Sequence, residues 1–440
     1  MVGVGVKQER KMIGSWSVVL SMVILALGVM AAEPAAASDL EGAIGPDVVV
    51  FELSGTWDWG AIGGVRAYSV GTTSCNRGDE DLEWIPDENR HPVIAQNLYR
   101  VTLADTNQPV EHGKIEMLGI SWLKHGFLSV NGSACGTCDH PAAGGEALGP
   151  GCSDPYGAGL NGSYSRLGPR SEVNAFTGYY DYPYPSPTGH PDIVGRLQVK
   201  ETEIIDDPAS YKYFVEGHYI APDDAGAANG MNNASHREAV LSGTSLDVVG
   251  ATEEGRPGIY AWQDLDPAVT VREVVVPNEG LFIVASKVGD NGDGTWHYQY
   301  SVFNLNSHLS GRSFSLPILP SSVISNTGFR DVDYHSGEDL LYDDTDWAVD
   351  IGPSTGWVTW FTDDHTTNPN ANALRWSTMY NFSFDADSPP QPAFARIGLF
   401  RDGGPSAVSV LVEAPADNAT PMFADGFEGG DTNSWSEVVP

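Results

Sequence analysis

The sequence predicts an all-β protein made of two sandwich-like β domains with long irregular loops. Short runs of β-branched and aromatic residues recur along the chain, and clusters of turn residues separate them. The chain holds 50 glycines and 29 prolines, and no stretch after residue 37 keeps a helical period for three turns. Strands at this spacing are typical of sandwiches and barrels.

The predicted strands follow one another from residue 47 to residue 415. Alternation of apolar and polar residues is clearest at 196–204 and 407–415, which indicates strands with one buried face. The other runs are rich in Val, Ile, Tyr and Phe, the residues that favour strands. They lie at 47–54, 98–103, 211–221, 271–277, 281–288 and 297–305.

A polar, turn-rich stretch at 251–258 (ATEEGRPG) marks the best domain boundary. We expect an N-terminal β domain over 38–270 with a cysteine-pinned loop, and a C-terminal β-sandwich-like domain over 271–415. The stretch 132–187 is rich in Gly, Pro, Ser and Asn, and irregular loops of that length are usually functional or disordered. Its cysteines and aromatic residues favour an ordered loop.

The first 37 residues have the layout of a secretory signal peptide. Three basic residues precede a mainly apolar run, and Ala35 and Ala37 occupy the −3 and −1 positions of an A-x-A cleavage site before Ser38. The alternative is a membrane anchor, but the apolar run of about 16 residues is just shorter than the usual span. We therefore expect a secreted or cell-surface chain with no membrane span after cleavage.

The chain is strongly acidic, with a formal charge of −35. The leader holds three basic and two acidic residues and contributes +1, so the remaining chain carries −36. Such a surface repels nucleic acid phosphates and anionic lipids, which argues against nucleic-acid binding. The acidity fits either salt adaptation and solubility or a set of carboxylate sites for calcium.

The four cysteines are candidates for two disulfides. Cys75, Cys135, Cys138 and Cys152 allow three pairings, and an oxidising compartment favours bridges. Pairing Cys75 with Cys152 closes a long loop, worth roughly 4 kcal/mol in the chain-entropy model. That pairing leaves Cys135 and Cys138 in a tight ring, which the other two pairings avoid. In each case the bridges pin the irregular loop.

The same stretch also supports a metal site. His125, Cys135, Cys138, His140 and Cys152 offer soft ligands for zinc or copper. An exported copper- or zinc-dependent enzyme is therefore an alternative function. Redox exchange through the C-x-x-C pair is a further alternative, although SACGTCDHPAAGG is a poor start for the helix that usually lowers a thiol pKa.

Three residues of this region are candidate ligand-binding residues: Trp122, Asp154 and Tyr156. Asp154 precedes a proline and is biased to extended geometry, so it either fixes the shape of the loop or orients a catalytic or ligating histidine. Loops on a rigid scaffold often carry recognition. The leading hypothesis is therefore a secreted or cell-surface β protein that binds an extracellular ligand or matrix.

A polysaccharide-active hydrolase is the third hypothesis, and it requires two carboxylates at a suitable separation. The turn GTWDWG places Asp58 between Trp57 and Trp59, as in a sugar-binding groove, although such a turn also serves to carry packed rings. No G-x-S-x-G elbow occurs in the sequence, which argues against an α/β-hydrolase.

Residues 416–440 form a linker and a tail motif, FADGFEGGDTNSWS, at 423–436. The motif resembles the F-x-D-G-F-E-x-G-D-x-S-x-W-S endings of exported bacterial proteins of unassigned function, with Asn433 in place of serine. Longer segments, among them SWLKHGF, GDGTWHYQYSVFNLNS and NALRWSTMYNFSFDADSPP, resemble stretches of uncharacterised secreted proteins of environmental bacteria. The resemblance implies a bacterial secreted or surface protein of this architecture, and it implies no particular chemistry.

Overall fold

The computed structural model describes residues 43–103, 113–333, 342–416 and 418. Regular structure in these residues is mostly antiparallel sheet, which confirms the predicted all-β fold with sandwich-like domains. The predicted leader (1–37) and tail motif (423–436) lie outside the described residues. Only short helices lie between the described strands: α1 (Ala158–Asn161), α2 (Pro222–Gly226), α3 (Tyr260–Leu265), η1 (Gly144–Glu146), η2 (Arg170–Glu172) and η3 (Glu201–Glu203).

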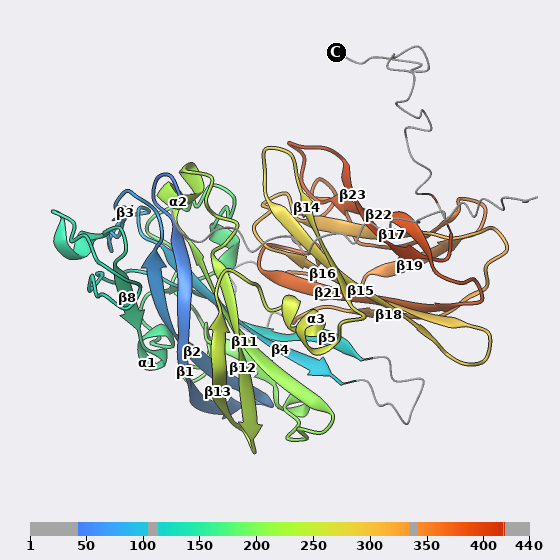
Figure 1. The fold of residues 1–440 in the computed structure, drawn as a ribbon, viewed down its shortest axis with the longest axis horizontal. Helices are drawn as coiled ribbons and strands as arrows, with labels where there is room; N and C mark the ends of the chain where they lie inside the picture. Colours follow the sequence, from blue (N-terminus) through green and yellow to red (C-terminus); the bar gives the residue numbers. More distant parts are fainter. Residues whose placement is uncertain (1–42, 104–112, 334–341, 417, 419–440) are drawn as a thin grey trace, which may run out of the picture. The chain divides into compact units, whose positions relative to one another are not determined.

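The N-terminal part of the chain forms an 11-stranded sheet with the main order β1-β2-β10-β5-β4-β11-β12-β13, coloured blue to green in Figure 1. These strands are β1 (Val48–Ile62), β2 (Val65–Asn76), β4 (Val93–Thr102), β5 (Lys114–Ile120), β10 (Leu197–Lys200), β11 (Tyr211–Ile220), β12 (Ala234–Ser242) and β13 (Ser245–Glu253). Short strands extend it or pair beside it: β6 (Leu123–Lys124), β8 (Ser153–Tyr156), β9 (Leu167–Gly168), β3 (Leu82–Glu83) and β7 (Ala147–Leu148).

The first sheet curls so that its outer strands approach each other. Three register shifts bend β1 against β2. On β1, the Leu53 backbone N–H donates to Thr252 Oγ1 of β13 at 2.9 Å, and its carbonyl accepts from Arg237 Nη1 of β12 at 2.7 Å. The curled sheet thereby encloses its own hydrophobic core, which includes Val50 and Tyr219.

The C-terminal part of the chain forms two five-stranded antiparallel sheets, coloured yellow to red in Figure 1. One has the order β14-β15-β16-β21-β18 and the other the order β19-β20-β17-β22-β23. Aromatic rings fill the core between them, with Phe314 and Trp360 at 4.9 and 5.5 Å from the ring of Phe382. The strands are β14 (Thr270–Val275), β15 (Leu281–Asp290), β16 (Trp296–Asn304), β17 (Gly311–Pro317), β18 (Ile324–Arg330), β19 (Ala348–Gly352), β20 (Trp357–Phe361), β21 (Thr378–Ala386), β22 (Gln391–Leu399) and β23 (Ala407–Ala414).

Strands β4 and β5 of the first sheet are buried on both faces. Leu98 and Leu118 pack into the core of the curled sheet. The adjacent Tyr99 and Met117 point to the other face and pack into the core shared with the five-stranded sheets. This explains why β4 is buried without interruption from Val93 to Val101.

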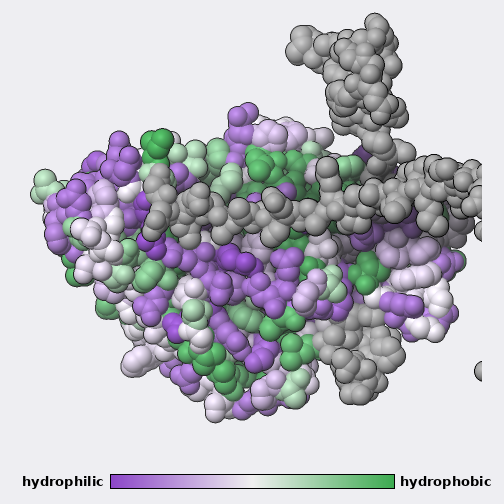
Figure 2. Space-filling model, in the orientation of Figure 1, coloured by the Kyte–Doolittle hydropathy of each residue, from purple (hydrophilic) through white to green (hydrophobic). Residues whose placement is uncertain are grey.

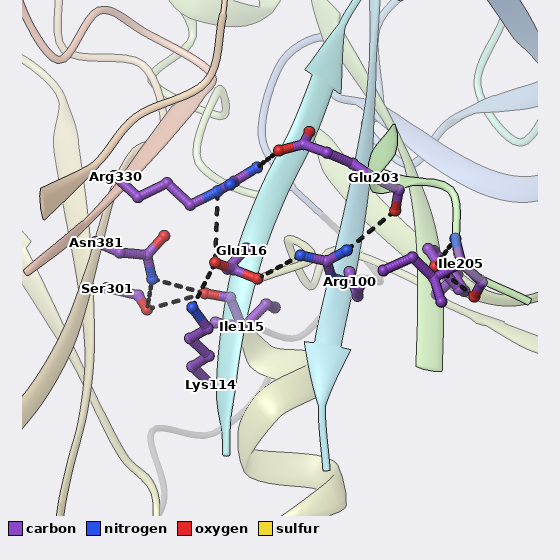
Figure 3. A network of polar contacts seen from close by, with 10 residues as sticks. Arg100, Lys114, Ile115, Glu116, Glu203, Ile205, Ser301, Arg330 and Asn381 are labelled. Atoms are coloured by element: carbon purple, nitrogen blue, oxygen red, sulfur yellow. Dashed lines mark hydrogen bonds and ion pairs between the residues drawn. The ribbon is translucent and has the colours of Figure 1, made fainter. Parts of the chain in front are cut away.

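An ion-pair network joins the first sheet to β18 (Figure 3). The side chain of Glu116 on β5 is 3% exposed and lies 2.9 Å from Arg100 Nη2, 2.7 Å from Lys114 Nζ and 3.5 Å from Arg330 Nε. Arg330 comes from β18 and also contacts Glu203 Oε1 at 2.6 Å. Burial alone would raise the pKa of Glu116, but the cations hold it below its ordinary value.

Asn381 on β21 makes a second polar connection beside this network (Figure 3). Its Nδ2 donates to the backbone oxygen of Ile115 at 2.6 Å and to Ser301 Oγ at 2.7 Å. All three residues are buried, so these hydrogen bonds fix how β5 packs on β16 and β21.

We expect Glu116→Gln to lower the free energy of unfolding by about 3 kcal/mol, because it takes the carboxylate from the buried Arg100 and leaves Arg330 with Glu203 alone. Glu238→Gln is the matched control, since its 2.9 Å ion pair with Lys212 is about one-third exposed on both sides, and we expect a loss below about 1 kcal/mol. Urea unfolding at pH 7 measures both. Equal losses in the two variants would show that the Glu116 network does not hold the sheets together.

Candidate functional site

The best candidate site is a pocket lined by three arginines, which we call the three-arginine pocket. It contains a cavity of about 20 Å³, which has room for about one water molecule, so a larger ligand would place only its tip there. Exposed hydrophobic residues are a weaker candidate, because on the face in Figure 2 they form separate patches among hydrophilic residues. The pocket is lined by Arg170, Ser171, Val173, His308, Ser310, Tyr342, Arg375, Trp376 and Arg401.

The strand pairing around Gly311 assembles this pocket. Gly311 begins β17 and pairs with Leu399, the last residue of β22. It also forms an isolated bridge with Leu374, just before β21. The segments 308–310, 375–376 and 400–401 therefore meet, although they are far apart in the sequence.

Arg375 is fixed by backbone oxygens and aromatic rings. Its Nη2 donates to the carbonyls of Pro369 and Ala371 at 3.2 and 3.1 Å. Its guanidinium carbon lies 3.8 Å from the ring centre of Tyr342 and 5.2 Å from that of Phe400. These contacts set the plane of the guanidinium group.

Arg401 approaches the pocket from the end of β22. Its Nη1 donates to the carbonyl of His308 at 2.5 Å and to Ser310 Oγ at 3.0 Å. Burial and the positive charge of Arg375 lower the pKa of Arg401 to about 10. Among the described residues, no carboxylate lies in ion-pair contact with either arginine, so two like charges share this site.

His308 is neutral at physiological pH. Burial, together with the charges of Arg401 and Arg375, lowers its pKa to about 4. Its backbone is held by Glu279, whose Oε1 accepts hydrogen bonds from the N–H groups of His308 and Leu309 at 2.7 and 3.1 Å. His308 therefore offers a ring nitrogen without adding charge.

Arg170 is a buried residue of the pocket lining, and its guanidinium group donates hydrogen bonds to surrounding protein oxygens. Its Nε reaches the carbonyl of Ser121 at 2.6 Å, its Nη1 that of Ser377 at 3.0 Å, and its Nη2 that of Gln96 at 2.9 Å. Nη2 also donates to Asn97 Oδ1 at 2.7 Å. Arg170 thus ties the first sheet to the loop that carries Arg375, and it adds positive charge to the pocket.

A serine and a histidine lie behind Arg170. Ser377 has a left-handed backbone (φ 56°), and its Oγ lies 3.2 Å from His218 Nδ1. Both side chains are fully buried, and burial lowers the pKa of His218 to about 3. Because no substrate reaches them, the pair serves the packing behind the pocket.

The cysteines form two disulfides, Cys75–Cys135 and Cys138–Cys152. This is one of the two pairings that avoid the tight ring. The closed loops span 60 and 14 residues, which corresponds to about 4 and 3 kcal/mol in the chain-entropy model. The staple interpretation of the loop therefore agrees with the structure.

The structure does not assemble the five residues predicted for a copper or zinc site. All four sulfurs are in disulfides, and His125 is buried with its ring 3.9 Å from the ring of Tyr184 and 5.0 Å from that of Tyr180. His140 Nδ1 lies 3.7 Å from the sulfur of Cys138. In the described ranges, no group of three or more His, Cys, Asp or Glu side chains is arranged to hold a metal, calcium included.

The three predicted ligand-binding residues lie mostly below the surface. Trp122 is 5% exposed and Asp154 is 1% exposed. Tyr156 is partly exposed and stacks on Phe127 at 4.2 Å. The role of all three residues in ligand binding stays a prediction.

Asp58, the candidate acid of the hydrolase hypothesis, forms an ion pair with Arg66 at 2.7 Å. Arg66 also contacts Glu201 at 3.1 Å. Trp57 is 56% exposed, whereas Trp59 has the guanidinium group of Arg196 at 3.7 Å from its ring centre. The acid is thus neutralised by a cation, and the hydrolase hypothesis stays a prediction.

Sequence reasoning missed Arg375 and Arg401. A signal was available, because the chain has only 23 Lys and Arg residues against 58 Asp and Glu, and each of the two arginines adjoins an aromatic residue, Trp376 or Phe400. Their convergence could not be foreseen, since it depends on the pairing of Gly311 with both Leu399 and Leu374.

Comparison with known proteins gives no matching family model and no matching curated protein. Fold and site together define a disulfide-bonded all-β protein with a cationic pocket. Within the described ranges, every helix is too short or too polar to cross a bilayer.

Asp154 makes the stability of the loop depend on pH. Its Oδ1 accepts from the Val130 N–H at 2.7 Å, and its Oδ2 has no hydrogen-bond partner among the described residues. Burial raises the pKa of Asp154 to about 7. Between the ordinary pKa of about 4 and this value, the folded chain holds a proton that the unfolded chain releases. Stability therefore falls as pH rises through this range.

We expect Asp154→Asn to reduce the loss of stability between pH 5 and pH 8, by up to about 1.4 kcal/mol per pH unit below pH 7. Urea unfolding at the two pH values measures the change. Asp350→Asn, at an exposed position of β19, should follow the wild type. An unchanged pH slope in Asp154→Asn would contradict the assignment of the proton to Asp154.

Proposed function

We propose that this chain is a secreted or cell-surface β protein that binds the anionic group of an extracellular ligand or matrix through the three-arginine pocket. The main support for this proposal is that Arg375 and Arg401 line the same pocket. Among the described residues, no carboxylate forms an ion pair with either arginine. This is notable in a chain of formal charge −35. Arg375 is buried and Arg401 is partly buried. The two cations repel each other, and a bound anion offsets that repulsion.

The pocket is rigid before any ligand arrives. Arg170 is hydrogen-bonded to three backbone carbonyls and one side chain. Rings fix the plane of Arg375, and Glu279 holds the backbone of His308. A preorganised set of donors loses little conformational freedom on binding, which favours affinity and selectivity.

We further propose that the chain is exported, with a leader at 1–37 removed before Ser38. Two disulfides support an oxidising compartment, and the tail motif resembles the endings of exported bacterial proteins. The intact mass of the protein recovered from the culture medium or the cell surface tests this proposal. A mature chain that begins at Ser38 and carries both bridges is expected, and a chain retained in the cytoplasm with free thiols would refute export.

Matched sugars test the binding proposal. We expect glucuronate and glucose 6-phosphate to stabilise the purified protein against urea, at constant ionic strength, and neutral glucose to have no effect. A ligand at one hundred times its dissociation constant adds about 2.7 kcal/mol to the free energy of unfolding. The double variant Arg375→Gln/Arg401→Gln should lose the effect, because it removes two of the guanidinium groups that line the pocket.

Arg396→Gln is the matched control, because Arg396 is an exposed arginine of β22 that stacks on Trp357 at 4.4 Å and does not line the pocket. It should respond to the two anionic sugars like the wild type. If glucose stabilises the protein as much as the anionic sugars do, or if neither anionic sugar stabilises it, the pocket is not an anion site.

A further inference from the structure

A cluster of carboxylate and amide side chains lies where the chain enters β1, and none of its members lines the three-arginine pocket. The members are Asp47, just before β1, Asp224 on α2, and Asn232 and Asn233, just before β12. Asp47, Asp224 and Asn233 are at most 1% exposed, and Asn232 is partly exposed. We call these four residues the aspartate–asparagine cluster.

Hydrogen bonds hold the four residues of the cluster together. The backbone N–H of Val48, which follows Asp47, donates to Asp224 Oδ1 at 2.9 Å. Asn233 Nδ2 donates to Asp224 Oδ2 at 2.8 Å, and Asn232 Nδ2 donates to Asp47 Oδ2 at 3.3 Å. Each aspartate is therefore bonded to one of two adjacent asparagines, so the four polar groups lie close together.

Three oxygens of the cluster have no hydrogen-bond partner among the described residues. They are Asp47 Oδ1, Asn232 Oδ1 and Asn233 Oδ1, and each is enclosed away from solvent. All three are acceptors. Buried polar atoms without a partner are rare and destabilising, so three acceptors in one cluster indicate a bound group that receives their electron pairs.

The cluster also has too little positive charge. Among the described residues, Asp47 and Asp224 form no ion pair, and Arg77, the cation that acts on Asp47, pairs with Glu254 at 2.8 Å. Burial raises the pKa of both aspartates, and the charge of Asp47 raises the pKa of Asp224 further. Two carboxylates that repel each other inside the protein are stabilised when a cation lies between them.

We infer that the aspartate–asparagine cluster is a calcium site built from two carboxylates and two amide oxygens. Calcium takes about six to eight oxygen ligands from carboxylates, amide carbonyls and water, and the cluster offers oxygen and neither sulfur nor imidazole. Two carboxylates balance the charge of one divalent ion. Because half of the donors are amides, the site differs from a group of three or more acidic side chains. The inference goes beyond the proposed function and does not depend on it.

Gly230 leaves one side of the cluster clear. A Cβ added to Gly230 would lie 3.3 Å from Asp224 Oδ2, so the glycine keeps space beside this oxygen. An ion at the site joins the start of β1 to α2 and β12. Calcium sites of extracellular modules have dissociation constants of about 0.1–1 mM, so a site of this kind fills outside the cell, where it fastens the first strand.

Isothermal titration calorimetry with calcium chloride tests this inference. The purified protein is freed of metal with a chelator and then titrated at pH 7 and constant ionic strength. We expect one calcium ion per chain, with a dissociation constant of about 1 mM or lower, and at least tenfold weaker binding of magnesium chloride. Asp47→Asn and Asp224→Asn should each weaken calcium binding at least tenfold, because each keeps the shape of the side chain and removes a carboxylate.

Urea unfolding distinguishes a lost site from a lost fold. In the presence of chelator, both variants should unfold close to the urea concentration at which the wild type unfolds, because asparagine preserves the packing. Added calcium should raise the midpoint of the wild type and leave the midpoints of Asp47→Asn and Asp224→Asn nearly unchanged. A calcium-dependent shift that survives in both variants would overturn the inference.

Asp293→Asn is the matched control. Asp293 is an exposed acidic residue of the GDNGDG hairpin between β15 and β16, which is a second group of oxygen donors. This variant should bind calcium like the wild type. Absence of calcium binding in the wild type, or its loss in Asp293→Asn alone, would show that the cluster is not a calcium site. Magnesium binding as tight as that of calcium would refute the choice of calcium.

Discussion

The fold depends on strands that are buried on both faces, because polar groups on these strands must find partners inside the protein. Glu216 on β11 shows the consequence. It accepts hydrogen bonds from Asn97 Nδ2 at 2.5 Å, from the Tyr99 hydroxyl at 3.1 Å and from the Gly258 N–H at 2.6 Å. Burial raises the pKa of Glu216 to about 7, and these donors partly offset the rise. The partners come from different segments, so satisfying one carboxyl group fixes several positions at once.

The same constraint builds the back of the pocket. Asn97 donates to Glu216 and also accepts from Arg170, whose Nη1 holds the carbonyl of Ser377 in the loop before β21. Arg375 stands two residues earlier in that loop. The position of Arg375 is therefore set by the buried polar network of the first sheet, as well as by the pairing of β17 with β22.

Sequence reasoning identified the fold class and the presence of two disulfides, but not their pairing, because only the first two follow from local signals and from the number of cysteines. The runs at 281–288 and 297–305 correspond to β15 and β16, since alternating or apolar runs between turn residues specify strands directly. The paired arginines are different. Arg375 and Arg401 each lie in an irregular segment between strands. Their encounter depends on long-range strand order, which a single sequence does not encode in any local form.

The loop at 132–187 shows a second limit of local signals. Its length, cysteines and aromatic residues predicted an ordered loop, and the two disulfides agree with that. The same features suggested recognition through Asp154 and Tyr156, yet Asp154 is buried, and Tyr156 is only partly exposed and stacks on Phe127. Aromatic and acidic residues in a pinned loop are needed to build its own small core, so their presence alone does not distinguish support from binding.

The acidic surface affects what a cationic pocket can select. Charges farther away than about 8 Å are largely screened at physiological salt, whereas contacts inside a partly buried pocket are not. The net charge of −35 therefore slows the approach of an anion more than it weakens a bound one. A polyanion would bring many of its charges against the acidic surface, while a single anionic group on a neutral carrier brings only the charge that enters the pocket. Acidic surface and arginine pocket together favour a ligand whose negative charge is isolated, so the surface contributes to selectivity although it makes no contact with the ligand.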